Sequence, residues 1–209
     1  MGASGIFITI EPEGGLAARL HAIQLRHDPK LANEFPPHVT IIGSSGAGPI
    51  DASMPVEELR AAVESVTRVT APVSVRFGPP MRFIGREIVV LPLDVHGPLR
   101  ALHEALKDSG IRYEATKWPY TPHCTLNMYA TLTDASLRSL LTVRESEPWT
   151  VHTLRTYHTR EGAAARLLFE SRLGNDRELQ DVGGRGGTGV PAKALAMAAA
   201  RSCLPPTPV

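Results

Sequence analysis

The chain has 209 residues and a formal net charge of +1, with 43% hydrophobic and 21% charged residues. This composition is ordinary for a globular protein, and so small a charge excludes a global electrostatic field that would draw the chain onto nucleic acid. The two cysteines, Cys124 and Cys203, lack CxxC spacing, so the sequence indicates neither a disulfide framework nor a zinc knuckle.

Runs of β-branched residues and helical spacing of apolar residues predict the elements in chain order. The first half gives a strand at 5–10, a helix with Leu16, Leu20 and Ile23 on one face, a strand at 38–42, a loop at 43–49, and a helix with Val56, Leu59, Val63 and Val66. The rest gives strands at 73–77, 81–84 and 87–95, a helix with Leu99, Leu102 and Leu106, a strand at 123–129, a helix with Leu137, Leu140 and Leu141 capped by Asp134, and strands at 149–159 and 166–173. This order predicts an α+β protein built as two similar halves.

The last part of the chain, residues 174–209, differs in composition from the rest. It contains a Gly-rich stretch at 183–187 and a Pro-rich end, so we predict a flexible tail outside a domain of residues 1–173. The N-terminus lacks the pattern of a signal peptide, and no stretch is long enough to cross a membrane. We therefore expect a cytoplasmic monomer without a membrane partner.

Two copies of one pattern carry the chemistry. Pro37-His38-Val39-Thr40 and Pro122-His123-Cys124-Thr125 both follow a proline-containing loop and begin a strand, with their histidines at positions 38 and 123, that is, 85 residues apart. Because side chains alternate along a strand, His and Thr of each copy share one face and the residue between them lies on the other. An imidazole beside a hydroxyl suits a phosphoryl group, since the hydroxyl donates to a non-bridging oxygen and the imidazole moves a proton.

Composition alone does not account for the repetition. Of the eight histidines, only these two have proline before them and threonine two residues later. Such a pattern is expected on the order of 0.05 times in a chain of this composition. The alternative is that both are structural histidines at the starts of strands, but this does not explain why the motif is repeated.

The sequence resembles the 2H phosphoesterases, which carry one H-x-[ST] motif in each half of a bilobal fold and include 2′-5′ RNA ligase-like proteins and cyclic nucleotide phosphodiesterases. The resemblance covers about residues 5–173. It implies a duplicated fold of two antiparallel sheets flanked by helices with a central cleft. It also implies that His38, Thr40, His123 and Thr125 face one another there, and that no metal or cofactor takes part.

One departure concerns the residues after the second motif. Many ligase-like members have a basic residue there, whereas Leu126 and Asn127 follow Thr125 in this chain. Asn127 falls on the strand face of His123, so we predict that it donates to the phosphate instead.

Aromatic, histidine and cysteine residues outside the four motif positions can have functional or structural roles. Phe35, Trp118, Tyr120 and Tyr129 flank the motifs and are candidates for stacking a nucleobase, with Tyr120 and Tyr129 the best of them, although packing explains any single one. His21, His27 and His103 fall on helices and are expected to be exposed. His152 and His158 share a strand face but lack a third ligand, so no metal site is expected, and Cys124 is expected in the core.

The sequence thus predicts a phosphoric diester hydrolase. One histidine starts neutral and takes a proton, and the other starts protonated and gives one, on a 2′,3′-cyclic phosphate of a nucleotide or RNA end. Ligation of 2′-5′ RNA, with an RNA 5′-hydroxyl as the second substrate, remains an alternative. A non-catalytic RNA or nucleotide binder of the same fold, and an interaction protein that docks through the tail, remain open as well. The sequence does not decide which histidine is the acid.

Overall fold

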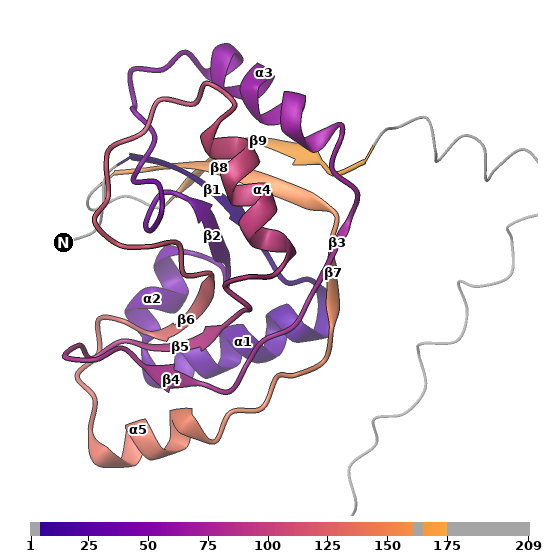
Figure 1. Cartoon of the computed structure of the whole chain (residues 1–209). Coiled ribbons are helices and arrows are strands. Elements are labelled where there is room, and N and C mark those ends of the chain that lie inside the picture. Colours follow the sequence, from indigo (N-terminus) through magenta and orange to yellow (C-terminus); the bar gives the residue numbers. More distant parts are fainter. Residues whose placement is uncertain (1–4, 161–164, 175–209) are drawn as a thin grey trace, which may run out of the picture. The chain divides into compact units, whose positions relative to one another are not determined.

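The computed structural model describes residues 5–160 and 165–174. Figure 1 shows the elements, which are β1 (Gly5–Ile10), α1 (Gly14–His27), α2 (Pro29–Glu34), β2 (Val39–Ile42), α3 (Val56–Thr67), β3 (Val73–Val75), β4 (Met81–Arg82), β5 (Val89–Pro92), α4 (Pro98–Lys107), β6 (His123–Asn127), α5 (Asp134–Leu141), β7 (Trp149–Val151), β8 (Thr153–Thr159) and β9 (Arg166–Arg172). The expected tail at 174–209 lies outside the described residues apart from Gly174, so its flexibility stays a prediction.

Two antiparallel sheets carry the fold, as expected. The larger sheet has seven strands in the order β4-β5-β6-β2-β1-β8-β9, and the smaller one pairs β3 with β7. The two sheets differ in size because the large sheet contains strands from both halves of the chain. Its halves, β4-β5-β6 and β2-β1-β8-β9, meet where β2 pairs with β6.

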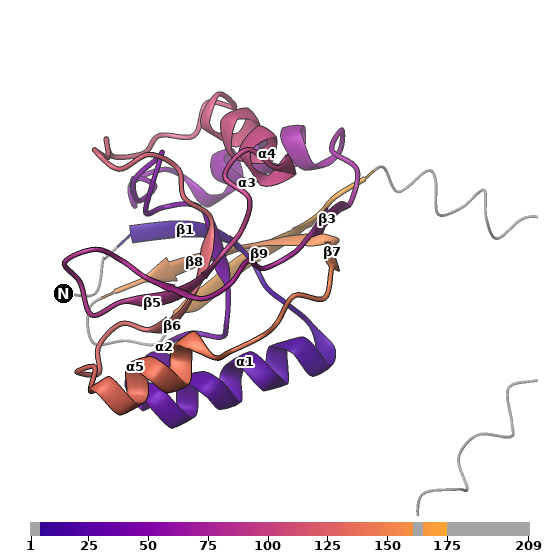
Figure 2. The ribbon, with the colours of Figure 1, turned by 60° about the horizontal axis from the view of Figure 1, so that its bottom comes forward.

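Helices cover both faces of the large sheet. Figure 2 shows α3 and α4 on one side and α1, α2 and α5 on the other. Correspondingly, α3 packs on β9 and α4 on β2, whereas α1 packs on β6. The apolar stripes predicted for α3 and α4 lie in the core, with Leu59, Val63, Leu99 and Leu106 almost completely buried. Each of the two strands that carry the motifs therefore has a helix packed on it, α4 on β2 and α1 on β6.

Several boundaries differ from the sequence prediction. The run at 149–159 is broken at His152 into β7 and β8, which belong to different sheets. The strand expected at 123–129 ends at Asn127. Thr133, rather than Asp134, caps α5 through a reciprocal capping box with Ser136. Each difference reflects a local hydrogen bond or a change of sheet that hydrophobic periodicity does not report.

The short helix α2 was not predicted, because six residues give no readable apolar stripe. It begins with Pro29, and the Asp28 side chain caps it by accepting from the Leu31 backbone N–H at 3.1 Å. The other carboxylate oxygen of Asp28 accepts from the backbone N–H groups of Met128 at 2.8 Å and Tyr129 at 2.7 Å. One buried carboxylate thus joins the α1–α2 junction to the segment that follows β6.

Asp28 should therefore contribute strongly to stability. Burial raises the pKa of its carboxyl, but hydrogen bonds from backbone N–H groups outweigh this effect and lower the pKa overall. We expect Asp28→Ala to reduce the free energy of unfolding by about 2–4 kcal/mol, because it leaves the N–H groups of Leu31, Met128 and Tyr129 without this acceptor.

Urea denaturation measures this loss. The matched control is Asp94→Ala, whose carboxylate accepts from the single backbone N–H of His96 in an exposed turn. Equal losses in the two variants would contradict the role assigned to Asp28.

Candidate active site

The two motifs lie side by side in the large sheet. Strands β2 and β6 pair antiparallel, and the partners are Val39 and Cys124, the middle residues of the two motifs. Both are completely buried. In an antiparallel register this places His38 opposite Thr125 and Thr40 opposite His123.

All four of these motif side chains are half-buried, in contrast to the fully buried residues between them. The alternation is the one expected for a strand with one core face and one open face. Two imidazoles and two hydroxyls therefore share a single face of the sheet. The sequence prediction grouped the same four residues, and the register supplies the contact that brings them together.

Each imidazole is fixed through its Nδ1 atom. His38 Nδ1 lies 2.8 Å from the carbonyl oxygen of Pro36, and His123 Nδ1 lies 2.7 Å from that of Thr121. Because a carbonyl can only accept, Nδ1 carries the hydrogen in both neutral rings and Nε2 is left with the lone pair. In both motifs the acceptor is the backbone two residues earlier, so the proline loops orient the two rings in the same way.

The electrostatic environment keeps both rings neutral near pH 7. Burial lowers the pKa of His38 to about 4, against the opposing effect of the Pro36 carbonyl, and the positive charge of His123 lowers it further. Burial also lowers the pKa of His123, again opposed by a carbonyl, that of Thr121. Because two positive charges at this distance repel each other, a proton on one ring disfavours a proton on the other.

Buried polar side chains brace the two motif strands from opposite faces of the sheet. Gln24 of α1 donates from Nε2 to the carbonyl oxygen of Thr125 at 2.7 Å. His103 of α4 donates from Nδ1 to the carbonyl oxygen of Ile41 at 2.7 Å. The prediction that His103 is exposed was wrong, because it is completely buried. The sequence does contain a signal for this burial, since residue 103 belongs to the apolar stripe of α4 beside Leu102.

Tyr120 lies in the interior under the loop that follows β2. It is only 3% exposed and stacks on His103, with the ring centroids 3.9 Å apart and the planes at 12°. A Cβ on Gly46, which has a φ of +72°, would collide with Nε2 of His103 and lie 2.9 Å from Cβ of Tyr120. This packing joins the loops next to the two motifs and gives Tyr120 a structural contact.

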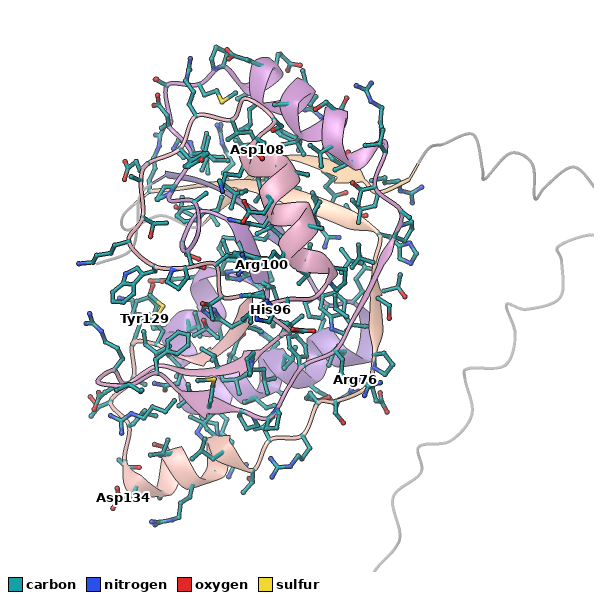
Figure 3. The ribbon with its side chains drawn as sticks, viewed as in Figure 1. Arg76, His96, Arg100, Asp108, Tyr129 and Asp134 are labelled. Atoms are coloured by element: carbon teal, nitrogen blue, oxygen red, sulfur yellow. The ribbon has the colours of Figure 1, made fainter. Side chains whose placement is uncertain are left out.

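Asn127 and Tyr129 also have partners within the protein. Asn127 is 1% exposed, and its Nδ2 donates to the carbonyl oxygens of Glu87 and Ala130 at 2.8 and 2.9 Å. Tyr129 lies beside α2 (Figure 3), with Lys30 Nζ 4.3 Å from its ring centroid. Burial raises the pKa of the Tyr129 hydroxyl to about 12. Binding of substrate by Tyr120, Asn127 and Tyr129 stays a prediction that these contacts do not require.

Among residues 5–160 and 165–174, no three His, Cys, Asp or Glu side chains are grouped as a metal site would need. Within the same ranges, no helix is both long and apolar enough to cross a membrane. A cavity of about 460 Å³ lies elsewhere, near Gly5, Tyr113 and His158, and none of the four motif residues lines it.

Comparison with known proteins gives a family and a fold. Residues 12–163 match the family described as the 2′-5′ RNA ligase superfamily. The crystal structure of TT0787 from Thermus thermophilus is similar with a TM-score of 0.61 and 16% identity, over 82% of this chain and 98% of that one.

Crystal structures of LigT from E. coli are similar as well. The apo form has a TM-score of 0.57 at 16% identity, over 82% of this chain and 98% of LigT. The complex with 3′-AMP has a TM-score of 0.51 at 16% identity, over 81% and 98%. No curated protein matches the chain. At these identities the solved structures show a shared fold.

The neutral His38 also predicts how stability depends on pH. Its folded pKa of about 4 lies below the usual 6.5, so the unfolded chain binds the proton more readily between these values. The contribution of His38 to the free energy of unfolding is fully present above pH 6.5 and is lost as the pH falls toward 4. The contribution of this one group is at most ~3 kcal/mol.

Chemical denaturation between pH 7 and pH 4.5 measures the effect. His38→Gln should lose less stability over this interval than the wild type, and His96→Gln, at an exposed turn residue, should behave like the wild type. An unchanged pH dependence in His38→Gln would show that His38 is not held neutral by the fold.

Proposed function

Because the chain belongs to the 2′-5′ RNA ligase superfamily, we propose that it is a phosphoesterase in which His38 and His123 act on one phosphodiester. The observation that carries the proposal is the pairing of Val39 with Cys124, which sets two H-x-T motifs against each other on one face. A pair of structural histidines would have no need of this arrangement or of two Nε2 lone pairs on the same face.

The proposed substrate is a 2′,3′-cyclic phosphate of a nucleotide or of an RNA end. LigT has been crystallised with 3′-AMP, ATP and NADP+, which supports a nucleotide as the substrate class. In-line attack needs a proton acceptor on the entering oxygen and a proton donor on the leaving one, and two imidazoles supply both.

We assign the role of base to His38 and the role of acid to His123. His38, whose pKa is lowered to about 4 by burial, starts neutral, and its Nε2 takes a proton from the attacking water. The new P–O bond forms as the bond from phosphorus to one ribose oxygen breaks. His123 starts protonated and gives its proton from Nε2 to the leaving oxygen, and the product is a phosphate monoester.

The anionic substrate assists this cycle. A phosphate close to both rings raises the pKa of His123, so the acid is protonated in the complex more often than in the free protein. Thr40 and Thr125 donate from their hydroxyls to the non-bridging oxygens. With the 5′-hydroxyl of a second RNA in place of the attacking water, the same steps give ligation, so assays with RNA ends test both outcomes.

A leaving group that needs no proton tests the assignment of roles. We expect His123→Ala to lose roughly 10²–10⁴ in kcat on a 2′,3′-cyclic nucleotide but far less on a deoxynucleoside 3′-(p-nitrophenyl phosphate), whose phenolate departs without an acid. His38→Ala should lose activity on both substrates, because both need an activated water.

Thr40→Ser and Thr125→Ser, which keep the hydroxyls, serve as mild controls in the same assays. Recovery of His38→Ala instead of His123→Ala on the aryl ester would reverse the roles, and recovery of neither would refute the acid role. All assays contain EDTA, because acid–base catalysis by the two histidines needs no metal. Loss of activity in EDTA with rescue by a divalent ion would overturn the proposed mechanism.

A further inference from the structure

Each of the two histidines contacts one phenylalanine ring. The centroids of Phe35 and His38 are 4.2 Å apart with the planes at 52°, and those of Phe83 and His123 are 5.1 Å apart at 82°. The two rings come from different parts of the fold. Phe35 is the C-cap residue of α2, and Phe83 lies in the hairpin between β4 and β5.

The ring of Phe35 is held firmly from behind. Its centroid lies 4.7 Å from that of Tyr157 on β8, at 62°. The Tyr157 hydroxyl donates to one carboxylate oxygen of Glu11 at 2.7 Å, and Arg155 donates to the other at 3.2 Å. Phe35 is thus packed between a catalytic candidate and a hydrogen-bonded network on the neighbouring strands.

The ring of Phe83 has a different setting. Phe83 donates its backbone N–H to the carbonyl oxygen of Ile88 at 2.9 Å, which closes the hairpin. The next residue, Ile84, is completely exposed, and Gly85 follows with a φ of +69°. The contact with His123 is therefore made from an exposed turn rather than from a packed layer.

We propose, on the basis of the proposed function, that Phe35 and Phe83 are positioning residues for this reaction. Phe35 fixes the ring plane of His38 and excludes water from it, so that His38 is neutral and can act as the base. Phe83 orients His123, the proton donor, from the hairpin between β4 and β5. Sequence patterns do not reveal this pairing, since Phe83 lies 40 residues before His123 in the chain.

One hydrogen bond does not fix the orientation of an imidazole ring. The bond from Nδ1 to a backbone carbonyl holds one edge of each ring, and an aromatic neighbour sets the remaining rotation. Excluding water disfavours the charged imidazolium, in agreement with burial as the largest cause of the low pKa of His38.

Because few charged groups among the described residues lie near His38, its pKa depends mainly on how far water reaches the ring. In the part of the chain that the structure describes, no ion pair involves His38, and its Nδ1 meets a neutral carbonyl. The titratable groups on the packed elements are His123 and Cys124 on β6, Tyr157 on β8 and, behind Tyr157, Glu11 and Arg155. Removing the Phe35 ring therefore admits water without removing a charge that contacts His38.

The test is an NMR titration of the histidine rings in the full chain, with the signals assigned from His38→Gln and His123→Gln. In Phe35→Ala the pKa of His38 should rise from about 4 toward the usual 6.5. Phe35→Leu, which keeps an apolar cover, should hold it low. The acid limb of the kcat–pH profile should move to higher pH in Phe35→Ala alone.

The corresponding variants at the hairpin are Phe83→Ala and its exposed neighbour Ile84→Ala. Phe83→Ala should lower kcat with little change in KM, because it loosens the proton donor, and Ile84→Ala should match the wild type. Thermal melting of every variant identifies loss of fold, and Phe35→Thr, which brings a polar hydroxyl in place of the ring, replaces Phe35→Ala where the latter is unfolded.

A His38 pKa that stays near 4 in folded Phe35→Ala or Phe35→Thr overturns the role of Phe35. An equal effect of Phe83→Ala and Ile84→Ala on kcat overturns the role of Phe83. These results are distinct from failure of the proposed function. A wild-type protein without turnover would reject that function, whereas the titration would still support or overturn the effect of the Phe35 ring on His38.

Discussion

The site depends on one cross-strand pair. Val39 and Cys124 are the registered partners of β2 and β6, and through them the two halves of the seven-stranded sheet become continuous. A shift by one residue would turn every side chain of the moved strand to the other face, which would bury His38 and Thr40 or expose Val39. The same contact therefore closes the core and assembles the reactive groups, so the fold and the site are not separable.

The chemistry of the pair follows from backbone carbonyls and apolar cover. Among the residues that the structure describes, no carboxylate holds either imidazole; the carbonyls of Pro36 and Thr121 accept from Nδ1 and leave the lone pair on Nε2. The environment lowers the pKa of both rings, which disfavours the charged state that one of them needs for turnover. An anionic phosphate offsets this penalty, so a neutral pair in the free protein is suited to a substrate that brings its own negative charge.

The sequence was sufficient for the fold class and for the four residues that share the site face. Repetition of P-H-x-T and the two-residue period of a strand were enough, because both are local properties. The sequence did not predict the long-range contacts. His103 was expected at the surface, yet it braces β2 from the interior, and Phe83 reaches His123 from a hairpin with no pattern of its own. The amide of Asn127 donates to two backbone carbonyls, contacts that residue spacing does not show, and its binding of phosphate stays a prediction.

The central claim is that His38 and His123 serve one displacement as a unit. Turnover of a 2′,3′-cyclic nucleotide by His38→Ala, His123→Ala and the double variant, with folding checked by thermal melting, tests it most directly. Each single change should lower kcat by roughly 10²–10⁴, and the double change should cost far less than the product of the two, because one proton transfer gains little without the other. Single variants that keep wild-type kcat, or losses that multiply as for independent residues, would contradict the account.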